Sequence, residues 1–226
     1  MKRRARICRR APVTTSAVPH IGMIAWLAWA LVGLTLAGCT AAPPLKLYVL
    51  SESPASSAEV TVASDPAPPP GAPVIEVARV TLPDYMDSRD LVVRQGDLLE
   101  RSSTGRWARR LSLATTDLVT ARLAMRHPDA WVSDQPQART PDYWLTVHIS
   151  RLDISSTGTG TVDADWEIVP RNVAVPVLRH RVHFAMSGAV GTDERVARFE
   201  RRLLERLARA IDFSSLPGAP SQLPPA

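Results

Sequence analysis

The first forty residues constrain this chain more than any other part of it. Six basic residues and no acidic ones precede position 39, and a charge-free apolar run of about 16 residues, 21–36, follows them. This order is typical of a secretory signal. The run is shorter than the ~20 residues that a spanning helix needs, although a membrane anchor remains the alternative on length alone.

The end of the apolar run favours a cleaved signal. Leu36-Ala37-Gly38-Cys39 resembles the lipobox of bacterial lipoproteins, in which a Leu and two small residues precede a Cys. The resemblance implies that 1–38 is a signal peptide and that Cys39 is acylated and becomes the N-terminus. Two acyl chains are enough for stable anchoring. In lipoproteins an Asp after the Cys favours retention in the inner membrane, so Thr40 favours the periplasmic face of the outer membrane.

The net charge changes meaning once the signal is removed. The whole chain has a formal charge of +5 and a pI near 9.9. Without the six basic residues of the signal, 21 of the 27 basic residues remain against 22 acidic ones, a charge of −1. A nearly neutral mature chain gives no reason to expect a nucleic-acid partner.

Candidate catalytic and metal-binding groups are few. The chain has two cysteines, Cys8 and Cys39, too few for a disulfide framework or a four-ligand zinc site. His180 and His183 are three residues apart on an expected strand, so they point to opposite faces. We therefore expect no catalytic residue, no metal and no cofactor other than the covalent lipid on Cys39. Asp163 and Asp165 share a face and keep acid–base chemistry open as an alternative.

The mature chain divides into a tether (39–44), one domain (45–212) with a Pro-rich loop (51–73), and a disordered tail (213–226). Proline removes backbone donors and fixes φ, so we expect no packed element in the loop. Alternation, β-forming residues and turn signals predict strands in the rest of the domain. The expected strands span 45–50, 74–82, 91–94, 98–101, 131–132, 143–154, 162–169 and 175–187.

Two amphipathic helices are expected among these strands. The first spans 107–126, with Leu111, Ala114, Leu118, Ala121 and Met125 recurring every three or four residues. The second begins after the capping residue Thr192 and runs to about Asp212. Its apolar stripe comprises Val196, Phe199, Leu203, Leu207 and Ile211. The order of elements predicts an α+β fold, with a mostly antiparallel or mixed sheet and both helices packed on one face.

One charged patch is lopsided enough to suggest a partner contact. Arg106, Arg109 and Arg110 surround Trp107, and only Glu100 is near them in sequence. The six arginines of the last helix, in contrast, alternate with acidic residues at i,i+4 spacing, which is typical of a solvated face.

Five short motifs together resemble a known family. They are Leu47-Tyr48-Val49-Leu50, the segment 77–87 ending in Leu82-Pro83-Asp84-Tyr85-Met86-Asp87, the strand Leu91-Val92-Val93-Arg94, Arg106-Trp107-Ala108, and Pro141-Asp142-Tyr143. In this order they are similar to the PqiC/YmbA-like ABC-transport auxiliary lipoproteins. Two departures are the long loop 51–73 and Arg109-Arg110.

The resemblance implies a non-catalytic periplasmic subunit, anchored in the outer membrane. It would work with an MCE-domain protein and an inner-membrane permease complex in lipid transport between membranes, supporting envelope integrity. The expected partner interface comprises Pro83, Tyr85, Asp87, Arg106, Trp107, Arg109 and Arg110. A homo-oligomer stays open, as do two alternative functions: an assembly lipoprotein of the lipopolysaccharide-export type, and an envelope hydrolase.

Overall fold

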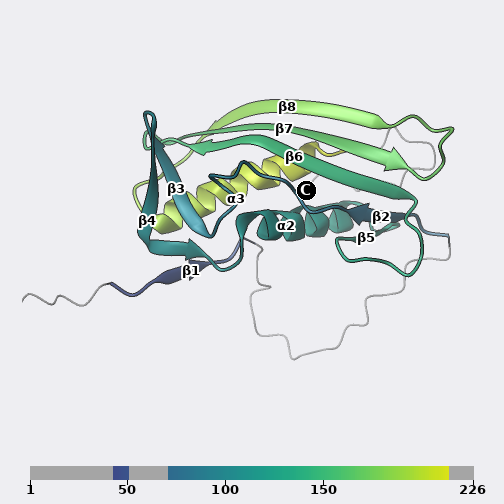
Figure 1. Ribbon diagram of the computed structural model, residues 1–226, viewed down its shortest axis with the longest axis horizontal. Coiled ribbons are helices and arrows are strands. Elements are labelled where there is room, and N and C mark those ends of the chain that lie inside the picture. Colours follow the sequence, from purple (N-terminus) through teal and green to yellow (C-terminus); the bar gives the residue numbers. More distant parts are fainter. Residues whose placement is uncertain (1–42, 51–70, 214–226) are drawn as a thin grey trace, which may run out of the picture. The chain divides into compact units, whose positions relative to one another are not determined.

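The computed structural model describes residues 43–50 and 71–213 (Figure 1). The predictions for the signal peptide, for Cys39 and for residues 51–70 of the Pro-rich loop therefore lie outside the described residues. So does the expected tail from residue 214 onward.

A five-stranded sheet forms one layer of the domain, in the order β5-β2-β6-β7-β8. The long strands β6 (Tyr143–Ile154), β7 (Thr159–Pro170) and β8 (Leu178–Ser187) are antiparallel neighbours. The short strands β2 (Val74–Val77) and β5 (Trp131–Ser133) pair in parallel, and β2 is also parallel to β6. The sheet is therefore mixed.

A second sheet has three strands, in the order β1-β4-β3. β3 (Asp90–Gln95) and β4 (Leu98–Trp107) form the predicted hairpin, whose turn contains Gly96 at φ 60°. A positive φ at this position favours glycine. β1 (Lys46–Tyr48) is an edge strand that pairs in parallel with the end of β4.

Both helices lie on the same face of the five-stranded sheet (Figure 1). α3 (Asp193–Ala210) begins at the predicted cap, because Thr192 Oγ1 accepts from Arg195 N at 3.3 Å. Arg126, the last residue of α2 (Leu111–Arg126), donates to three carbonyls at the end of α3. A cation near the last carbonyls of a helix stabilises its C-terminus. Arg126 therefore both stabilises the end of α3 and joins the two helices.

The predicted stripe of α3 is confirmed, since Val196, Phe199, Leu203, Leu207 and Ile211 are all buried. Glycine on β7 lets this helix approach the sheet closely. A Cβ on Gly160 would lie 2.6 Å from Leu203 Cδ1, closer than packed atoms can be. The α+β prediction, with two helices on one face of a mixed sheet, is therefore confirmed.

Helix α2 differs from its prediction in two respects. Trp107 ends β4, and the helix begins four residues later, at Leu111. Ala121 and Met125 of the expected stripe are exposed, whereas Thr115, Val119 and Leu123 are buried. The buried face thus includes Thr115, a polar β-branched residue that a count of aliphatic residues does not detect.

The end of the domain extends one residue into the expected tail. Phe213 is buried and packs edge-on against His127 and Tyr143, with ring centroids 5.5 and 6.4 Å apart. Phe213 therefore belongs to the core.

Candidate functional site: the polar surface at the start of helix α2

A short turn brings the residues of the Leu-Pro-Asp-Tyr motif to the start of α2. The backbone N–H groups of Met86 and Asp87 both donate to the carbonyl of Pro83, at 2.8 and 3.0 Å. Met86 is buried, and Leu111 N donates to Ser88 O at 2.9 Å. The turn is therefore held by the core on one side and by the helix on the other.

Asp87 supplies the negative charge that the start of α2 lacks. The helix has no side-chain cap at Arg110 and no acidic residue in its first turn. Asp87 Oδ1 accepts from Ser112 N at 3.3 Å, and Oδ2 accepts from Arg110 Nη1 at 3.2 Å. Burial acts to raise the pKa of Asp87, but the hydrogen bonds from Ser112 and Arg110 outweigh it and lower that pKa. A carboxylate at a helix N-terminus is stabilised by the helix dipole.

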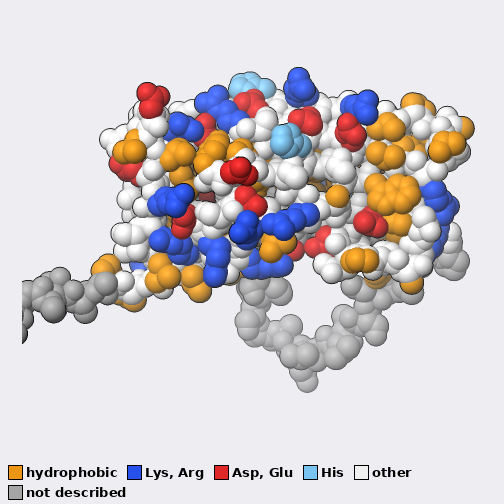
Figure 2. Space-filling model, in the orientation of Figure 1, with side chains coloured by type: hydrophobic (Ala, Val, Ile, Leu, Met, Phe, Trp, Pro, Cys, Tyr) orange, Lys and Arg blue, Asp and Glu red, His pale blue; other side chains and the backbone are white. Residues whose placement is uncertain are grey.

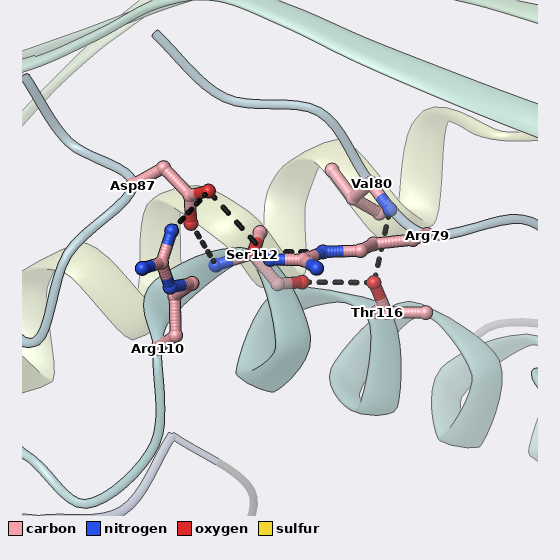
Figure 3. A network of polar contacts seen from close by, with 6 residues as sticks. All are labelled: Arg79, Val80, Asp87, Arg110, Ser112 and Thr116. Atoms are coloured by element: carbon pink, nitrogen blue, oxygen red, sulfur yellow. Dashed lines mark hydrogen bonds and ion pairs between the residues drawn. The ribbon is translucent and has the colours of Figure 1, made fainter. Parts of the chain in front are cut away.

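Arg79 and Val80 extend this network along the helix (Figure 3). Arg79 donates twice to Ser112 Oγ, at 3.1 and 2.7 Å, and its guanidinium lies 3.6 Å from Asp87. Val80 N donates to Thr116 Oγ1 at 2.9 Å, and Thr116 in turn donates to Ser112 O at 2.8 Å. These contacts attach the segment after β2 to the first two turns of α2.

Tyr85 faces a second carboxylate, on β6. Its hydroxyl donates to Asp153 Oδ1 at 3.2 Å, and Arg94 and Arg151 donate to the same carboxylate at 3.0 and 2.8 Å. Burial acts to raise the pKa of Asp153, but the arginine hydrogen bonds outweigh it and lower that pKa. Tyr85 is half-buried, so it serves an internal contact as well as the surface.

Trp107 lies in the core, and its neighbour Arg106 is held by Asp90. Trp107 is 1% exposed, and Arg106 Nε lies 2.9 Å from Asp90 Oδ1. Near the indole lies Glu200 of α3, which is fully buried. Among the described residues, neither carboxylate oxygen of Glu200 has a hydrogen-bond partner of normal geometry. Burial raises the pKa of Glu200 to about 8, although the nearby indole acts to lower it.

Four arginines at the surface of this region form what we call the arginine cluster: Arg79, Arg89, Arg109 and Arg110. Arg109 pairs with Asp117, and Arg79 and Arg110 share Asp87. Arg89 donates to the carbonyls of Trp107 and Ala108. Three of the four guanidinium groups thus contact two carboxylates, and the fourth, Arg89, contacts backbone carbonyls.

Figure 2 shows Lys and Arg side chains gathered over this part of the molecule. Guanidinium groups bind carboxylate and phosphate oxygens in fixed geometry. The cluster can therefore bind an anionic group of a partner.

Of the expected interface residues, the structure brings Asp87 and Arg110 into direct contact, and it places Pro83 and Tyr85 in the adjoining turn. Arg109 lies two residues after the buried Trp107 and is exposed. Arg79 and Arg89 were not among the expected residues. The signal for Arg79 was a charged residue within the apolar segment 77–82, whereas nothing local marks Arg89.

The expected separation of His180 and His183 holds in β8. His180 stacks on Trp166 with ring centroids 5.5 Å apart, while His183 pairs with Asp163 on the other face. Within 43–50 and 71–213, no group of three or more His, Cys, Asp or Glu side chains could hold a metal ion. In the same ranges, no helix has the length and apolar character to span a membrane.

Comparison with known families assigns this fold and motif set. A family model described as the ABC-type transport auxiliary lipoprotein component matches residues 48–212. The chain belongs to this family. The match covers the folded domain and includes all of α2, α3 and the arginine cluster. Members of this family are auxiliary lipoprotein components of ABC-type transporters. No curated protein matches the sequence significantly.

One solved structure supports the fold, and two others are more distantly similar. An uncharacterized protein has a TM-score of 0.58 and 13% identity, with 74% of this chain and 95% of that chain covered. Protein XCC0632 from Xanthomonas campestris has a TM-score of 0.48 and 18% identity, with 63% and 85% covered. A PelC dodecamer from Paraburkholderia phytofirmans has a TM-score of 0.36 and 10% identity, with 60% and 84% covered. The fold comparison rests on the first structure, because the other two scores are below 0.5.

Proposed function

We propose that this protein is a non-catalytic accessory subunit of an MCE/ABC-type system that moves lipids between membranes. It is anchored by acylated Cys39 at the periplasmic face of the outer membrane and supports envelope integrity. The observation that carries the proposal is the order of the chain. A lipobox-like Cys39 stands a few residues before a domain that belongs to the transport auxiliary lipoprotein family.

The arrangement of polar groups supports a binding role. Asp87, at the start of α2, accepts hydrogen bonds from Arg110 and from the backbone N–H of Ser112, which keep it ionised and leave it a poor proton acceptor. The arginine cluster has more cations than carboxylates, so it is suited to an acidic surface on a protein partner. We assign it as the contact with the MCE-domain protein or the permease complex.

Co-purification tests this function. The lipidated protein, extracted from envelopes in mild detergent, should retain an MCE-domain protein and an ABC permease. Recovery of a lipopolysaccharide-export complex instead would favour the assembly alternative. Turnover of peptidoglycan or an ester substrate by the purified protein would favour a hydrolase and would contradict the proposal.

Charge reversal tests the interface. Arg109→Glu with Arg110→Glu should lower recovery of the transporter partner by about tenfold, because like charges repel across a contact. The matched control is Arg179→Glu on β8, since Arg179 is also exposed and paired with a carboxylate, Glu167. Arg110 contacts Asp87, so the single variant Arg109→Glu, at an exposed pair, guards against loss of folding. Equal recovery for cluster and control variants would rule out this interface.

A further inference from the structure

Edge strand β1 and its flanking residues carry an exposed apolar row. Leu45, Leu47 and Val49 alternate along the chain and are 55%, 57% and 53% exposed. The intervening Tyr48 packs against the core, and Leu50 is fully buried. We call Leu45, Leu47 and Val49 the apolar row. Figure 2 shows hydrophobic side chains gathered at the end of the domain where Figure 1 places β1.

The row is limited to the outermost strand of its sheet. Leu47 is in register with Arg106 on β4, and Arg106 is in register with Asp90 on β3. Arg106 and Asp90 form an ion pair at 2.9 Å. The outward face of the three-stranded sheet therefore changes from aliphatic to charged within one strand. An amphipathic helix that lies at a lipid–water interface likewise has an apolar face bordered by charged residues.

The chain length places this edge near the proposed anchor. Leu45 follows Cys39 by six residues, and six residues fully extended span at most about 20 Å. The interfacial region of a bilayer leaflet is itself several ångströms thick. A lipid on Cys39 would thus hold the apolar row within reach of the bilayer surface at all times, so a weak contact there would be populated.

We propose that the apolar row is a second, non-covalent membrane contact, which seats β1 against the bilayer surface and orients the domain on it. This inference rests on the proposed acylation of Cys39 and adds an orientation to it. Three half-exposed aliphatic side chains offer roughly 300 Å² at most, well below the ~800 Å² per partner of a standard protein interface. A small apolar area close to an acyl anchor is better matched to a bilayer than to a second copy.

Spin labels on the processed lipoprotein test this contact. Once Cys8 leaves with the signal and Cys39 is acylated, Leu47→Cys introduces the single reactive thiol. A matched label at Ala185→Cys, an exposed position on β8, serves as the control. The protein is reconstituted in vesicles of phosphatidylethanolamine and phosphatidylglycerol. Label accessibility is measured with oxygen, which concentrates in lipid, and with a water-soluble nickel chelate.

The label at position 47 should be more accessible to oxygen than the label at position 185. It should also be less accessible to the nickel chelate. A label at 47 as open to nickel as the one at 185 would overturn the inference. If the label at 47 is protected from both reagents, and is protected in detergent as well as in vesicles, the row contacts a protein partner or a second copy. That result would also overturn the inference. A label at Val49→Cys repeats the test if the first variant fails to fold.

The mass of the N-terminal peptide separates the two proposals. An unacylated Cys39 would overturn the anchor and the inference together. An acylated Cys39 with a solvent-exposed row would overturn only the inference.

Discussion

Both the outer face of β6–β8 and the network at the start of α2 contain ion pairs of carboxylates, but the two sets of pairs have different structural roles. On the sheet, Asp163 pairs with His183 and Glu167 pairs with Arg179, and all four side chains are substantially exposed. At α2, Asp87 contacts Arg79, Arg110 and the backbone of Ser112, and it is joined to the buried Thr116 through Ser112. Exposed ion pairs contribute little to the free energy of unfolding, because solvent screens the charges and ordering the side chains costs entropy. The α2 network instead attaches a core segment to a helix.

The comparison shows that the role of a carboxylate depends on how deeply it is buried and on which groups contact it. Glu200 is the extreme case, because it is fully buried and no cation pairs with it among the described residues. Burial disfavours the charged form, so Glu200 is protonated in the folded protein at neutral pH. Three carboxylates at three depths thus give three expected effects on stability.

The largest effect is expected at Glu200. The pKa of Glu200 is raised from 4.5 to about 8 in the folded protein, so the folded state holds a proton that the unfolded state has lost. The stability is full below about pH 4.5 and is lost as the pH rises through about 8, by on the order of 5 kcal/mol in total. Urea unfolding across this range should show the loss, and Glu200→Gln should abolish it.

Glu194→Gln is the matched control, because Glu194 lies exposed on the same helix. It should leave the pH dependence of wild type in place. A Glu200→Gln protein with an unchanged slope would show that another group causes the pH dependence.

A smaller effect is expected at Asp87. Asp87→Ala removes the charge at the start of α2 and the partner of Arg79 and Arg110, which should lower the free energy of unfolding by about 2 kcal/mol. The lowered pKa of Asp87 means that wild type loses this contribution as the pH falls through that folded-state pKa. Thermal or urea unfolding at neutral pH measures the difference. An effect as small as that of a sheet-face variant would remove the contrast between the two regions.

The smallest effect is expected on the sheet face. Asp163→Ala and His183→Ala should each change the free energy of unfolding by about 0.5 kcal/mol or less, because the pair is exposed. The same unfolding measurement applies. A loss above about 1 kcal/mol would show that the outer face of β6–β8 is coupled to the core, and the two regions would then not differ in kind.

The parts of the fold that were predictable are those with a local cause. The alternation of Tyr143, Leu145, Val147 and Ile149 predicts the buried face of β6, and the structure buries all four. The 3.6-residue period and the cap at Thr192 likewise predict α3. In each case the pattern lies within one element, so the residues alone report it.

The errors have non-local causes. Trp107 reads as a helix start, but it pairs with Tyr48 in a parallel strand contact, and this extends β4 to residue 107. The buried face of α2 includes Thr115 and Thr116 because α2 packs against α3 and the segment at Val80. Such contacts join residues that are far apart in the chain, and hydrophobic periodicity carries no information about them.

The expected site shows the same division. Local sequence indicates a charged patch around Arg106, Arg109 and Arg110. It does not indicate that Arg79, 31 residues before Arg110, shares Asp87 with it. The turn 83–88 brings these two arginines together, and that turn is positioned by the buried Met86.

The sequence by itself determined the signal-like N-terminus, the lipobox-like Cys39, the α+β class and the helix stripe of α3, because each is encoded in consecutive or regularly spaced residues. Only the tertiary structure decided that the chain forms two sheets, that Trp107 and Glu200 are buried together, and that four arginines gather at the start of α2. These features depend on which distant segments pack against one another, and packing is selected by the whole core at once.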